Sequence, residues 1–349
     1  MNIYSVFKHL AFKIDPEFMH DLTINSAKTL PKISELFDPL KPNKKYQLTD
    51  GPLTWGFPVG VAAGFDKNGN AINFFENLGF GALEAGTVTK IPQKGNNKPR
   101  VFRHAKINSV QNAMGFPNAG SEKILKNIKD TELNNICLGI NIGKNKDTSD
   151  TDTPAEYAYL YKMFAPFCDY LVVNISSPNT PGLRSFQKEE LLAPILKAIN
   201  FERTLFDRPV FIKIAPDLED ADLKMICELS KKFNFSGIIA TNTTIQHKFG
   251  AGGLSGDYIK PYSQQLRKKA CEFLREDPSQ TIIGVGGIDS YQEIKDFWRM
   301  GGGLTQIYTS FIFKGPQLLK DIAFDIEKDI EKYQVETVQQ LFEAIKEKS

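Results

Sequence analysis

The sequence has few cysteines, and none is spaced for metal binding. Its 349 residues include only Cys137, Cys168, Cys227 and Cys271, which form no CxxC pair. Zinc sites and disulfide frameworks normally require closely spaced or paired cysteines. Neither is therefore expected, no other metal site is predicted, and a reducing compartment is favoured.

The sequence also lacks a charge excess and a long apolar run. Forty-three Lys and Arg oppose 41 Asp and Glu, which leaves a net charge of +2. This is too small for a phosphate-neutralising surface, so nucleic acid is not expected as a partner. The longest uncharged apolar run, residues 55–65, contains three glycines and a proline. We therefore expect no membrane-spanning segment, and the N-terminus predicts no signal peptide.

Eight short apolar or β-branched runs alternate with segments of helical period from residue 55 onward. This alternation is typical of βα units around a parallel sheet, and eight units predict an α/β fold, a closed (β/α)₈ TIM barrel. The predicted strands are Val59–Ala62, Ala82–Ala85, Leu138–Asn141, Tyr170–Asn174, Val210–Ile214, Gly237–Thr241, Ile282–Val285 and Leu304–Tyr308.

The first 33 residues predict a small helical hairpin. Asp15 and Pro16 suit the N-cap and first position of its second helix, and a Pro- and Lys-rich linker follows. We expect residues 1–45 to form an N-terminal element with its linker, and residues 46–349 to form the barrel with a C-terminal helix. The hairpin could cap the bottom of the barrel or lie on a membrane surface with an apolar mouth.

Polar and glycine-rich segments follow the predicted strands, at the end where barrel enzymes place their active sites. Glycine loops at 252–256 and 286–287, with 308–310 after the last strand, suit phosphate binding through backbone N–H groups. Lys67 and Lys213 lie at strand ends. Each could face a flavin, form a Schiff base, or pair with an acid, Asp66 for Lys67 and Asp217 or another acid for Lys213.

The segment from Asn174 to Thr180 is the most specific string. Pro178 restricts Ser177 to an extended backbone, and amides at Asn112, Asn174, Asn179 and Asn242 can bind a polar heterocycle. The sequence has four histidines and no GxSxG motif, so a Ser-His-Asp hydrolase is poorly supported.

These strings resemble the class 2, quinone-linked and membrane-associated dihydroorotate dehydrogenase family over nearly the whole chain. The matching strings are AAGFDKNG (62–69), EAGTVT (84–89), GNNKPRVFR (95–103), NAMGF (112–116), GINIGKNK (139–146), NISSPNTPGLR (174–184), KIAPDL (213–218), ATNTT (240–244), GGLSG (252–256), IGVGGIDS (283–290) and QIYTSFIFKGP (306–316). The resemblance implies oxidation of dihydroorotate to orotate on one noncovalent FMN, which a membrane quinone reoxidises, in pyrimidine biosynthesis. It also implies peripheral attachment to a membrane, at the cytoplasmic face of the inner membrane if the source is bacterial.

The resemblance also assigns roles to residues. Ser177 would be the catalytic base, which distinguishes this class from one that uses cysteine, and Thr180 and Phe116 would line the exit of its proton. Substrate would be held by Lys67, Asn112, Ala113, Met114, Gly115, Phe116, Asn174, Asn179, Asn242 and Thr243. FMN would be held by Ala63, Gly64, Thr87, Asn141, Asn174, Lys213, Thr241, Gly256, Gly287, Tyr308 and Thr309. His20, Arg103 and Tyr308 would lie near the quinone. Thr309 stands where the family pattern has serine, and the loop 246–251 is short.

Two other classes of function remain open from the residues alone. Another phosphate-binding barrel enzyme, such as an aldolase that uses Lys213, would share the glycine loops. A membrane-bound scaffold would share the hairpin. A bound flavin distinguishes the predicted oxidoreductase from both.

Overall fold

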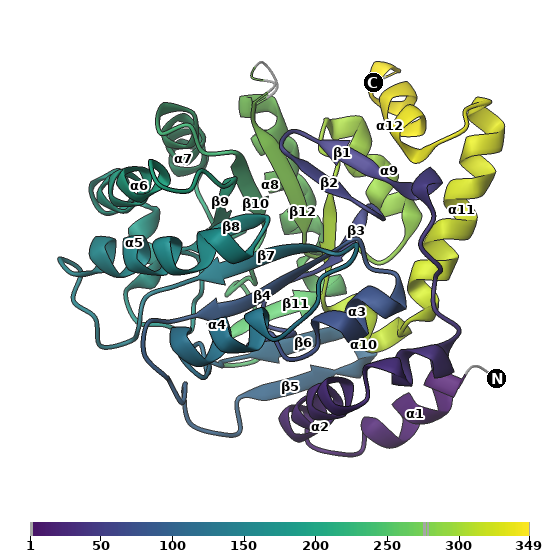
Figure 1. Cartoon of the computed structure of the whole chain (residues 1–349), viewed down its shortest axis with the longest axis horizontal. Coiled ribbons are helices and arrows are strands. Elements are labelled where there is room, and N and C mark those ends of the chain that lie inside the picture. Colours follow the sequence, from purple (N-terminus) through teal and green to yellow (C-terminus); the bar gives the residue numbers. More distant parts are fainter. Residues whose placement is uncertain (1–2, 275–276, 278, 349) are drawn as a thin grey trace.

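The chain folds as a closed barrel of eight parallel strands in a computed structural model that describes residues 3–274, 277 and 279–348 (Figure 1). Around the barrel the strands follow the order of the chain, and the last pairs with the first. They are β3 (Val59–Val61), β4 (Ala82–Val88), β7 (Cys137–Ile142), β8 (Tyr170–Asn174), β9 (Val210–Ile214), β10 (Gly237–Ala240), β12 (Thr281–Val285) and β13 (Thr305–Ile307). The predicted fold and all eight predicted strands are confirmed.

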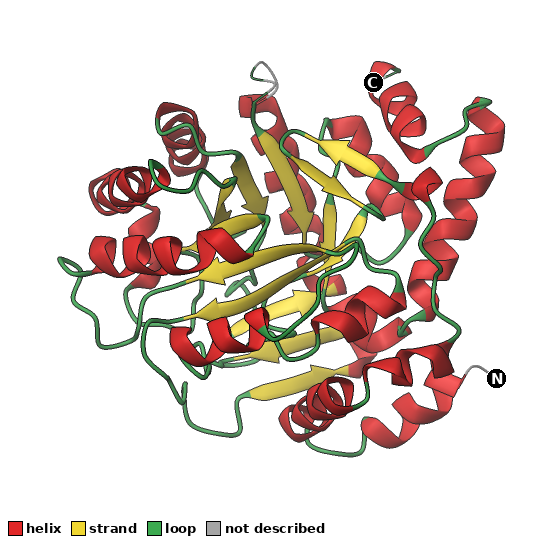
Figure 2. Cartoon of the chain, in the orientation of Figure 1, coloured by secondary structure: helices red, strands yellow, loops and turns green. Residues whose placement is uncertain are grey.

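Helices cover the outside of the barrel (Figure 2). The strands are buried on both faces because side chains also fill the inside. The covering helices are α3 (Ile72–Leu78), α4 (Ser121–Lys129), α5 (Thr153–Phe164), α6 (Glu189–Arg203), α7 (Asp220–Lys232), α8 (Lys260–Leu274), α9 (Tyr291–Met300), α10 (Thr309–Lys314) and α11 (Gln317–Tyr333). The predicted C-terminal helix, α12 (Val338–Glu347), buries one apolar face and packs against α9 outside the barrel.

The N-terminal helices α1 (Ile3–Ala11) and α2 (Pro16–Thr29) form the predicted hairpin. The Asp15 side chain accepts a hydrogen bond from the N–H of Phe18, so the predicted N-cap is confirmed. The hairpin lies at the C-terminal end of the strands, since His20 on α2 contacts Lys67 in the loop after β3. The alternative in which it caps the bottom of the barrel is therefore wrong. Short 3₁₀ turns at Pro31–Phe37 and Lys44–Tyr46 occupy the predicted linker.

A two-stranded hairpin, β1 (Leu48–Asp50) and β2 (Leu53–Trp55), covers the opposite end of the barrel. The Gly51 backbone in its turn comes so close to Thr281, the first residue of β12, that a Cβ there would lie 1.9 Å from the threonine Oγ1. Buried Leu48, Leu53 and Trp55 close that end with apolar side chains. The bottom of the barrel is thus sealed by a segment for which the sequence predicted no structure.

A second element that the sequence did not predict is an antiparallel sheet of β5 (Val101–His104), β6 (Ser109–Asn112) and β11 (Gly253–Gly256). These strands are four residues long, β11 contains two glycines, and β5 is not buried, so none carries a clear periodic signal. The sheet lies beside the C-terminal end of the barrel and supports α2 (Figure 1). No helix among the described residues is long and apolar enough to cross a membrane.

Candidate functional site

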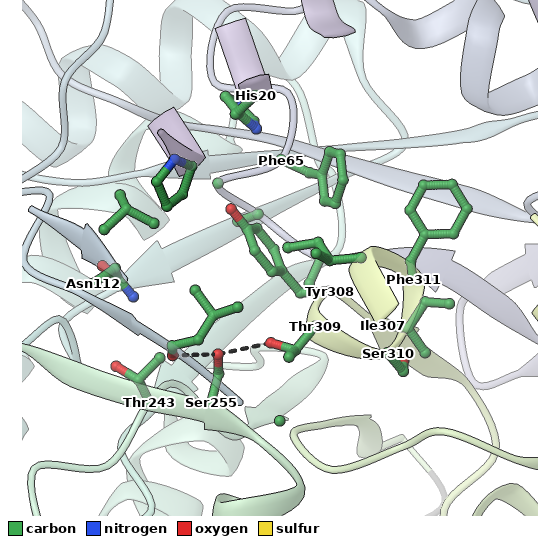
Figure 3. Close-up of a pocket in the computed structure, with 18 of the residues that line it drawn as sticks. His20, Phe65, Asn112, Thr243, Ser255, Ile307, Tyr308, Thr309, Ser310 and Phe311 are labelled. Carbon is green, nitrogen blue, oxygen red and sulfur yellow. Dashed lines mark hydrogen bonds between the residues drawn. The ribbon is translucent and has the colours of Figure 1, made fainter. Parts of the chain in front are cut away.

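One cavity of about 480 Å³ lies at the C-terminal end of the barrel and extends outward to α1 and α2 (Figure 3). Its inner half is formed by strand ends and their loops, and its outer half by the hairpin, Phe65 and α10. The predicted site residues on this wall are His20, Ala63, Gly64, Lys67, Thr87, Arg103, Asn112, Met114, Gly115, Phe116, Asn174, Ser177, Asn179, Lys213, Thr241, Asn242, Thr243, Gly256, Gly287, Tyr308 and Thr309. The structure thus brings together residues up to 289 positions apart, from His20 to Thr309. Their roles stay predictions.

Three predicted site residues, Ala113, Asn141 and Thr180, do not line the cavity. Asn141 lies one layer beneath the wall and accepts hydrogen bonds from Thr87 Oγ1, at 2.5 Å, and Asn174 Nδ2, at 3.0 Å. The Ala113 N–H donates to the Arg100 carbonyl, which closes the loop after β6. Thr180 is buried, and its hydroxyl has no hydrogen-bond partner among the described residues.

The serine loop after β8 presents Ser177 to the cavity. The Asn179 N–H donates to Ser177 Oγ at 3.3 Å, and Asn179 Nδ2 donates to Asn112 Oδ1 at 2.9 Å. Asn242 Nδ2 donates to Ser176 Oγ at 3.0 Å, which brings the loop after β10 to the same place. The four predicted asparagines therefore converge, and each is held by a neighbour from another strand end.

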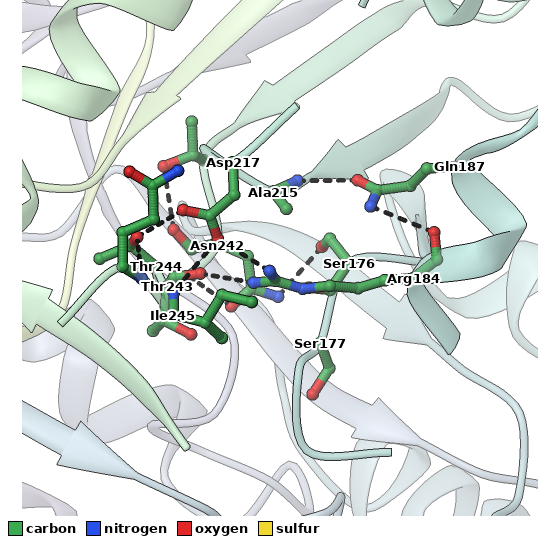
Figure 4. A network of polar contacts seen from close by, with 12 residues as sticks. Ser176, Ser177, Arg184, Gln187, Ala215, Asp217, Asn242, Thr243, Thr244 and Ile245 are labelled. Atoms are coloured by element: carbon green, nitrogen blue, oxygen red, sulfur yellow. Dashed lines mark hydrogen bonds and ion pairs between the residues drawn. The ribbon is translucent and has the colours of Figure 1, made fainter. Parts of the chain in front are cut away.

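Arg184 and Asp217 link these loops (Figure 4). The sequence did not suggest this contact, because it offered Asp217 only as a partner for Lys213 and gave Arg184 no role. The Arg184 guanidinium donates to the Ser176 carbonyl at 3.1 Å, to Asp217 at 2.7 Å and to the Thr243 carbonyl at 2.9 Å. Asp217 also accepts hydrogen bonds from the Thr244 hydroxyl and the Ile245 N–H. Because Arg184 binds both loops, it positions Ser177 relative to Asn242 and Thr243.

The suggested ion pair between Lys213 and Asp217 is wrong, because Asp217 pairs with Arg184. Lys213 Nζ instead donates to Glu84 Oε1 at 3.0 Å, and both side chains are buried. The other alternative for Lys213, pairing with a different acid, is thus confirmed. An aldolase lysine must be free to attack a carbonyl, whereas Lys213 Nζ is engaged in this buried ion pair, so the aldolase alternative is not supported.

The glycine loops and α10 form a cradle at one side of the inner half. The backbone at Gly287 has a φ of 74°, and a Cβ there would lie 2.7 Å from the Cα of Lys260. A Cβ at Gly256, with a φ of 89°, would lie 2.2 Å from the Asn108 carbonyl oxygen. Only glycine fits these positions, and the Ser255 and Thr309 hydroxyls, 2.7 Å apart, stand beside them. Closely approachable backbone with hydroxyls suits a phosphate group.

Lys67 and His20 meet where the two halves of the cavity join. Lys67 Nζ lies 2.6 Å from His20 Nε2. Burial lowers the pKa of Lys67 to about 8, and burial together with the charge of Lys67 lowers the pKa of His20 well below its usual range. A neutral imidazole can accept the lysine hydrogen bond at neutral pH. The suggested pairing of Lys67 with Asp66 is wrong, because the Asp66 carboxylate accepts from the N–H groups of Asn68, Asn70 and Ala71.

The hairpin is attached to the rest of the chain by polar contacts on its inner side. Arg103 donates to the carbonyls of Ala11 and Ile14, at 3.1 and 3.0 Å, and its guanidinium lies over the Phe12 ring. Buried Glu17 pairs with Arg100 at 2.6 Å. Tyr4 donates to the Ile312 carbonyl at 2.7 Å. Arg103 thus both lines the cavity and holds the end of α1.

The outer side of the hairpin is apolar and exposed. The exposed side chains are Val6, Phe7, Leu10, Ile14, Phe18 and Leu22, with Leu10 60% and Phe18 58% exposed. Beneath them, Tyr308 packs on Phe65 with ring centroids 5.0 Å apart, and burial raises the pKa of Tyr308 to about 12. Tyr308 therefore stays protonated at neutral pH and presents its hydroxyl as a hydrogen-bonding group.

The fold and the site define a class of protein: a TIM-barrel enzyme with a phosphate cradle and an amide-lined pocket at the C-terminal ends of its strands. The sequence profile of dihydroorotate dehydrogenase matches residues 52–330. The chain is 42% identical over 330 residues to dihydroorotate dehydrogenase (quinone) of Vibrio parahaemolyticus, which covers 89% of this chain and 96% of that one. It is 40% identical to the enzyme of the same name from Serratia proteamaculans, covering 91% and 98%.

A crystal structure agrees with these sequence relatives. DHODH from Eimeria tenella, solved in complex with ferulenol, superposes with a TM-score of 0.86 at 32% identity over 94% of each chain. This chain belongs to the dihydroorotate dehydrogenase family, and its relatives from Vibrio and Serratia are both of the quinone-linked type. The resemblance found in the sequence is confirmed.

Proposed function

We propose that this protein oxidises (S)-dihydroorotate to orotate on one noncovalently bound FMN and passes the electrons to a membrane quinone, in pyrimidine biosynthesis. The observation that carries the proposal is the single cavity that joins a polar inner half to an apolar outer half. A polar heterocycle binds best against polar cavity walls, and a long-tailed quinone binds best against apolar ones. One cofactor between the two halves could react with each of these molecules in turn.

The cradle and the neighbouring strand ends fit FMN. Gly256, Gly287 and Thr309 would hold its phosphate, and Ala63, Gly64, Thr87, Thr241 and Tyr308 would surround the rest of the molecule, with Asn141 supporting Thr87 from beneath. Lys213 supplies a cation near the floor of the cavity, and Asn174 supplies an amide. When bound, FMN would supply the acceptor for the hydride from C6 of dihydroorotate.

The serine loop would perform the proton chemistry. Ser177 Oγ takes the proton from C5, and Thr180 and Phe116 line the way by which it leaves. Asn112, Asn179, Asn242 and Thr243, with the backbone of Met114 and Gly115, orient the ring through its amide groups. Lys67 binds the carboxylate. Serine is a weak base, so its catalytic contribution depends on this fixed geometry.

The hairpin would form the quinone entrance. His20, Arg103 and Tyr308 offer polar groups at its inner end, and the exposed apolar side chains of α1 and α2 would rest in the interfacial layer of a membrane. Residues 1–45 then act as the membrane element and residues 46–349 as the catalytic barrel; Met1, Asn2 and Ser349 lie outside the described residues. The proposed location is the membrane periphery, at the cytoplasmic face of the inner membrane if the source is bacterial.

An absorbance spectrum tests the proposal directly. The purified protein should be yellow, and anaerobic dihydroorotate should bleach the flavin band, which a long-tailed quinone should restore. Chromatography of the acid-released chromophore should give FMN. A colourless protein would favour a scaffold, and a released FAD would contradict the cofactor assignment.

A further inference from the structure

Glu84 is a buried carboxylate that the proposed mechanism does not use. It lies on β4 with no exposed surface and does not line the cavity. Its Oε1 accepts hydrogen bonds from Lys213 Nζ at 3.0 Å and Asn141 Nδ2 at 2.6 Å. Its Oε2 accepts from Gln306 Nε2 at 2.7 Å. Three barrel strands thus direct donors to one carboxylate beneath the cavity floor.

Burying a carboxylate in the interior of a barrel carries a desolvation cost, which a paired charge and hydrogen bonds can only offset. Leucine or valine would fill the same volume without that cost, since the interior of such barrels is usually apolar. Two of the donors, Lys213 and Gln306, reach the cavity wall, and Asn141 supports Thr87 and Asn174, which also reach it. Every partner of the Glu84 carboxylate among the described residues therefore lines the cavity or supports residues that line it.

We propose that Glu84 is a positioning residue that fixes Lys213 against the cofactor, and that its negative charge balances the charge of the lysine there. The inference rests on the proposed function, because it requires a flavin above Lys213. The ion pair holds Lys213 Nζ at one place beneath the cavity floor, and the carboxylate offsets the charge of the lysine there.

The other titratable groups in this part of the barrel do not compete with the pair. The hydroxyl of Tyr170 on β8 accepts a hydrogen bond from Gln306 Nε2 at 3.1 Å. Burial, followed by the charge of Glu84, raises the pKa of Tyr170 well above its usual range, and burial raises the pKa of Cys137 on β7. Both stay neutral near pH 7, so neither adds a charge beside the ion pair.

Glu84→Gln is the variant that tests the proposal, because it keeps the shape and removes the charge. Gln306 Oε1 is buried and has no hydrogen-bond partner among the described residues. A rotation of the Gln306 amide would let that oxygen accept from the new amide. Glu156→Gln is the matched control, since Glu156 is also buried but accepts only backbone N–H groups, from Asn145 and Lys90, away from the cavity.

The midpoint potential of the bound flavin should be measured from pH 5.5 to 9. In Glu84→Gln an unbalanced lysine cation stabilises the anionic reduced flavin at low pH, so the equilibrium constant for reduction should rise at least tenfold, about 30 mV for a two-electron couple. As the pH increases and Lys213 loses its proton, the potential should return toward that of the wild type. Glu156→Gln should follow the wild type throughout.

Two further variants separate the possible outcomes. The effect should vanish when Glu84→Gln is made in a Lys213→Met background. If Glu84→Gln fails to fold, Glu84→Asp keeps a charge that is withdrawn from Lys213, and its potential should fall below that of the wild type at high pH. The inference would be overturned if the potential of Glu84→Gln followed that of the wild type at every pH, or if the same shift appeared without Lys213. Neither result would overturn the proposed function. A wild-type protein that binds no flavin would overturn both the proposed function and the inference.

Discussion

The inner and outer halves of the cavity are built by different physical means. In the inner half, side chains from separate strand ends bond to one another, as Asn179 does to Asn112 and Arg184 to Asp217. In the outer half, α1 and α2 contribute apolar surface, part of which faces outward and stays exposed. Hydrogen-bonded groups fix a small polar ligand at defined atoms, whereas apolar walls accept a tail of variable shape. The two halves therefore suit two reactants.

Replacing the proposed base should give the largest effect, and it should impair only the half-reaction assigned to the inner half of the cavity. In Ser177→Ala the C5 proton loses its acceptor, so flavin reduction by dihydroorotate should slow by roughly 10² to 10⁴, the usual range for a positioned general base. Rapid-mixing absorbance of the flavin-replete variant measures this rate. Near-normal reduction would remove Ser177 from the mechanism.

Deleting residues 1–33 should selectively impair the half-reaction assigned to the outer half of the cavity. Reoxidation of the reduced flavin by a long-tailed quinone should slow by more than about tenfold, because the apolar wall that would bind the tail is gone. Mixing reduced protein with quinone gives the rate, and a small soluble acceptor is the control that should still work. A deletion that lowers the melting temperature and slows flavin reduction equally would instead support a purely structural hairpin.

Single exposed side chains on the hairpin should control membrane attachment. Phe18→Ser removes a ring whose burial in a membrane interface is worth about 1.5 to 3 kcal/mol, so liposome binding should weaken about ten- to a hundredfold. Phe201→Ser is the matched control, since Phe201 is 76% exposed on α6, outside the hairpin. Cosedimentation with lipid vesicles measures both, and equal effects would contradict attachment through α1 and α2.

The junction of the halves should respond to pH through Lys67. Because its pKa is lowered to about 8, Lys67 is charged below pH 8 and neutral above it. The dissociation constant of orotate, an anion, should therefore rise by up to about tenfold per pH unit above pH 8. Spectral titration of the bound flavin measures it, and Lys67→Met should bind weakly with a flat profile. A flat wild-type profile would show that the lysine charge does not bind substrate.

The smallest effect on the reaction should come from the opposite end of the barrel, where Asp50 of β1 affects stability and not catalysis. Burial raises the pKa of Asp50 from 3.8 to about 6. Between those two pH values the folded state keeps a proton on Asp50, whereas the unfolded state has released it. Stability falls as the pH rises across that window, by up to about 3 kcal/mol. Asp50→Asn should be the more stable protein above pH 6 and equal to the wild type below pH 4. Denaturant unfolding at both pH values checks this, with unchanged flavin reduction expected.

The sequence predicted the regular parts of the molecule because their signals are local. Each barrel strand is a short apolar run between helical segments, and the N-cap at Asp15 is a local pattern. The antiparallel sheet was missed because β5, β6 and β11 are short and because β11 pairs with β6 across 141 positions, from Asn112 to Gly253. Local periodicity carries no information about such a partner.

Most predicted site residues line the cavity, but their partners could not be read from the sequence. The strings around Ser177 and Lys213 carried the resemblance, yet Lys213 pairs with Glu84, 129 positions away, and not with nearby Asp217. Arg184 and Asp217 lie inside the matching strings, but their link joins two loops and exists only in the folded chain, so the sequence did not predict it. The contact of His20 with Lys67 is of the same kind.

One stopped-flow measurement tests most directly whether the two halves serve two half-reactions. The rate of flavin reduction by dihydroorotate and the rate of its reoxidation by quinone should be measured on the same preparations of wild type, Ser177→Ala and the protein lacking residues 1–33. We predict opposite selectivity: Ser177→Ala slows reduction and leaves reoxidation near wild type, and the deletion does the reverse. If both variants slow the same half-reaction, or each slows both equally, the two halves do not divide the reaction.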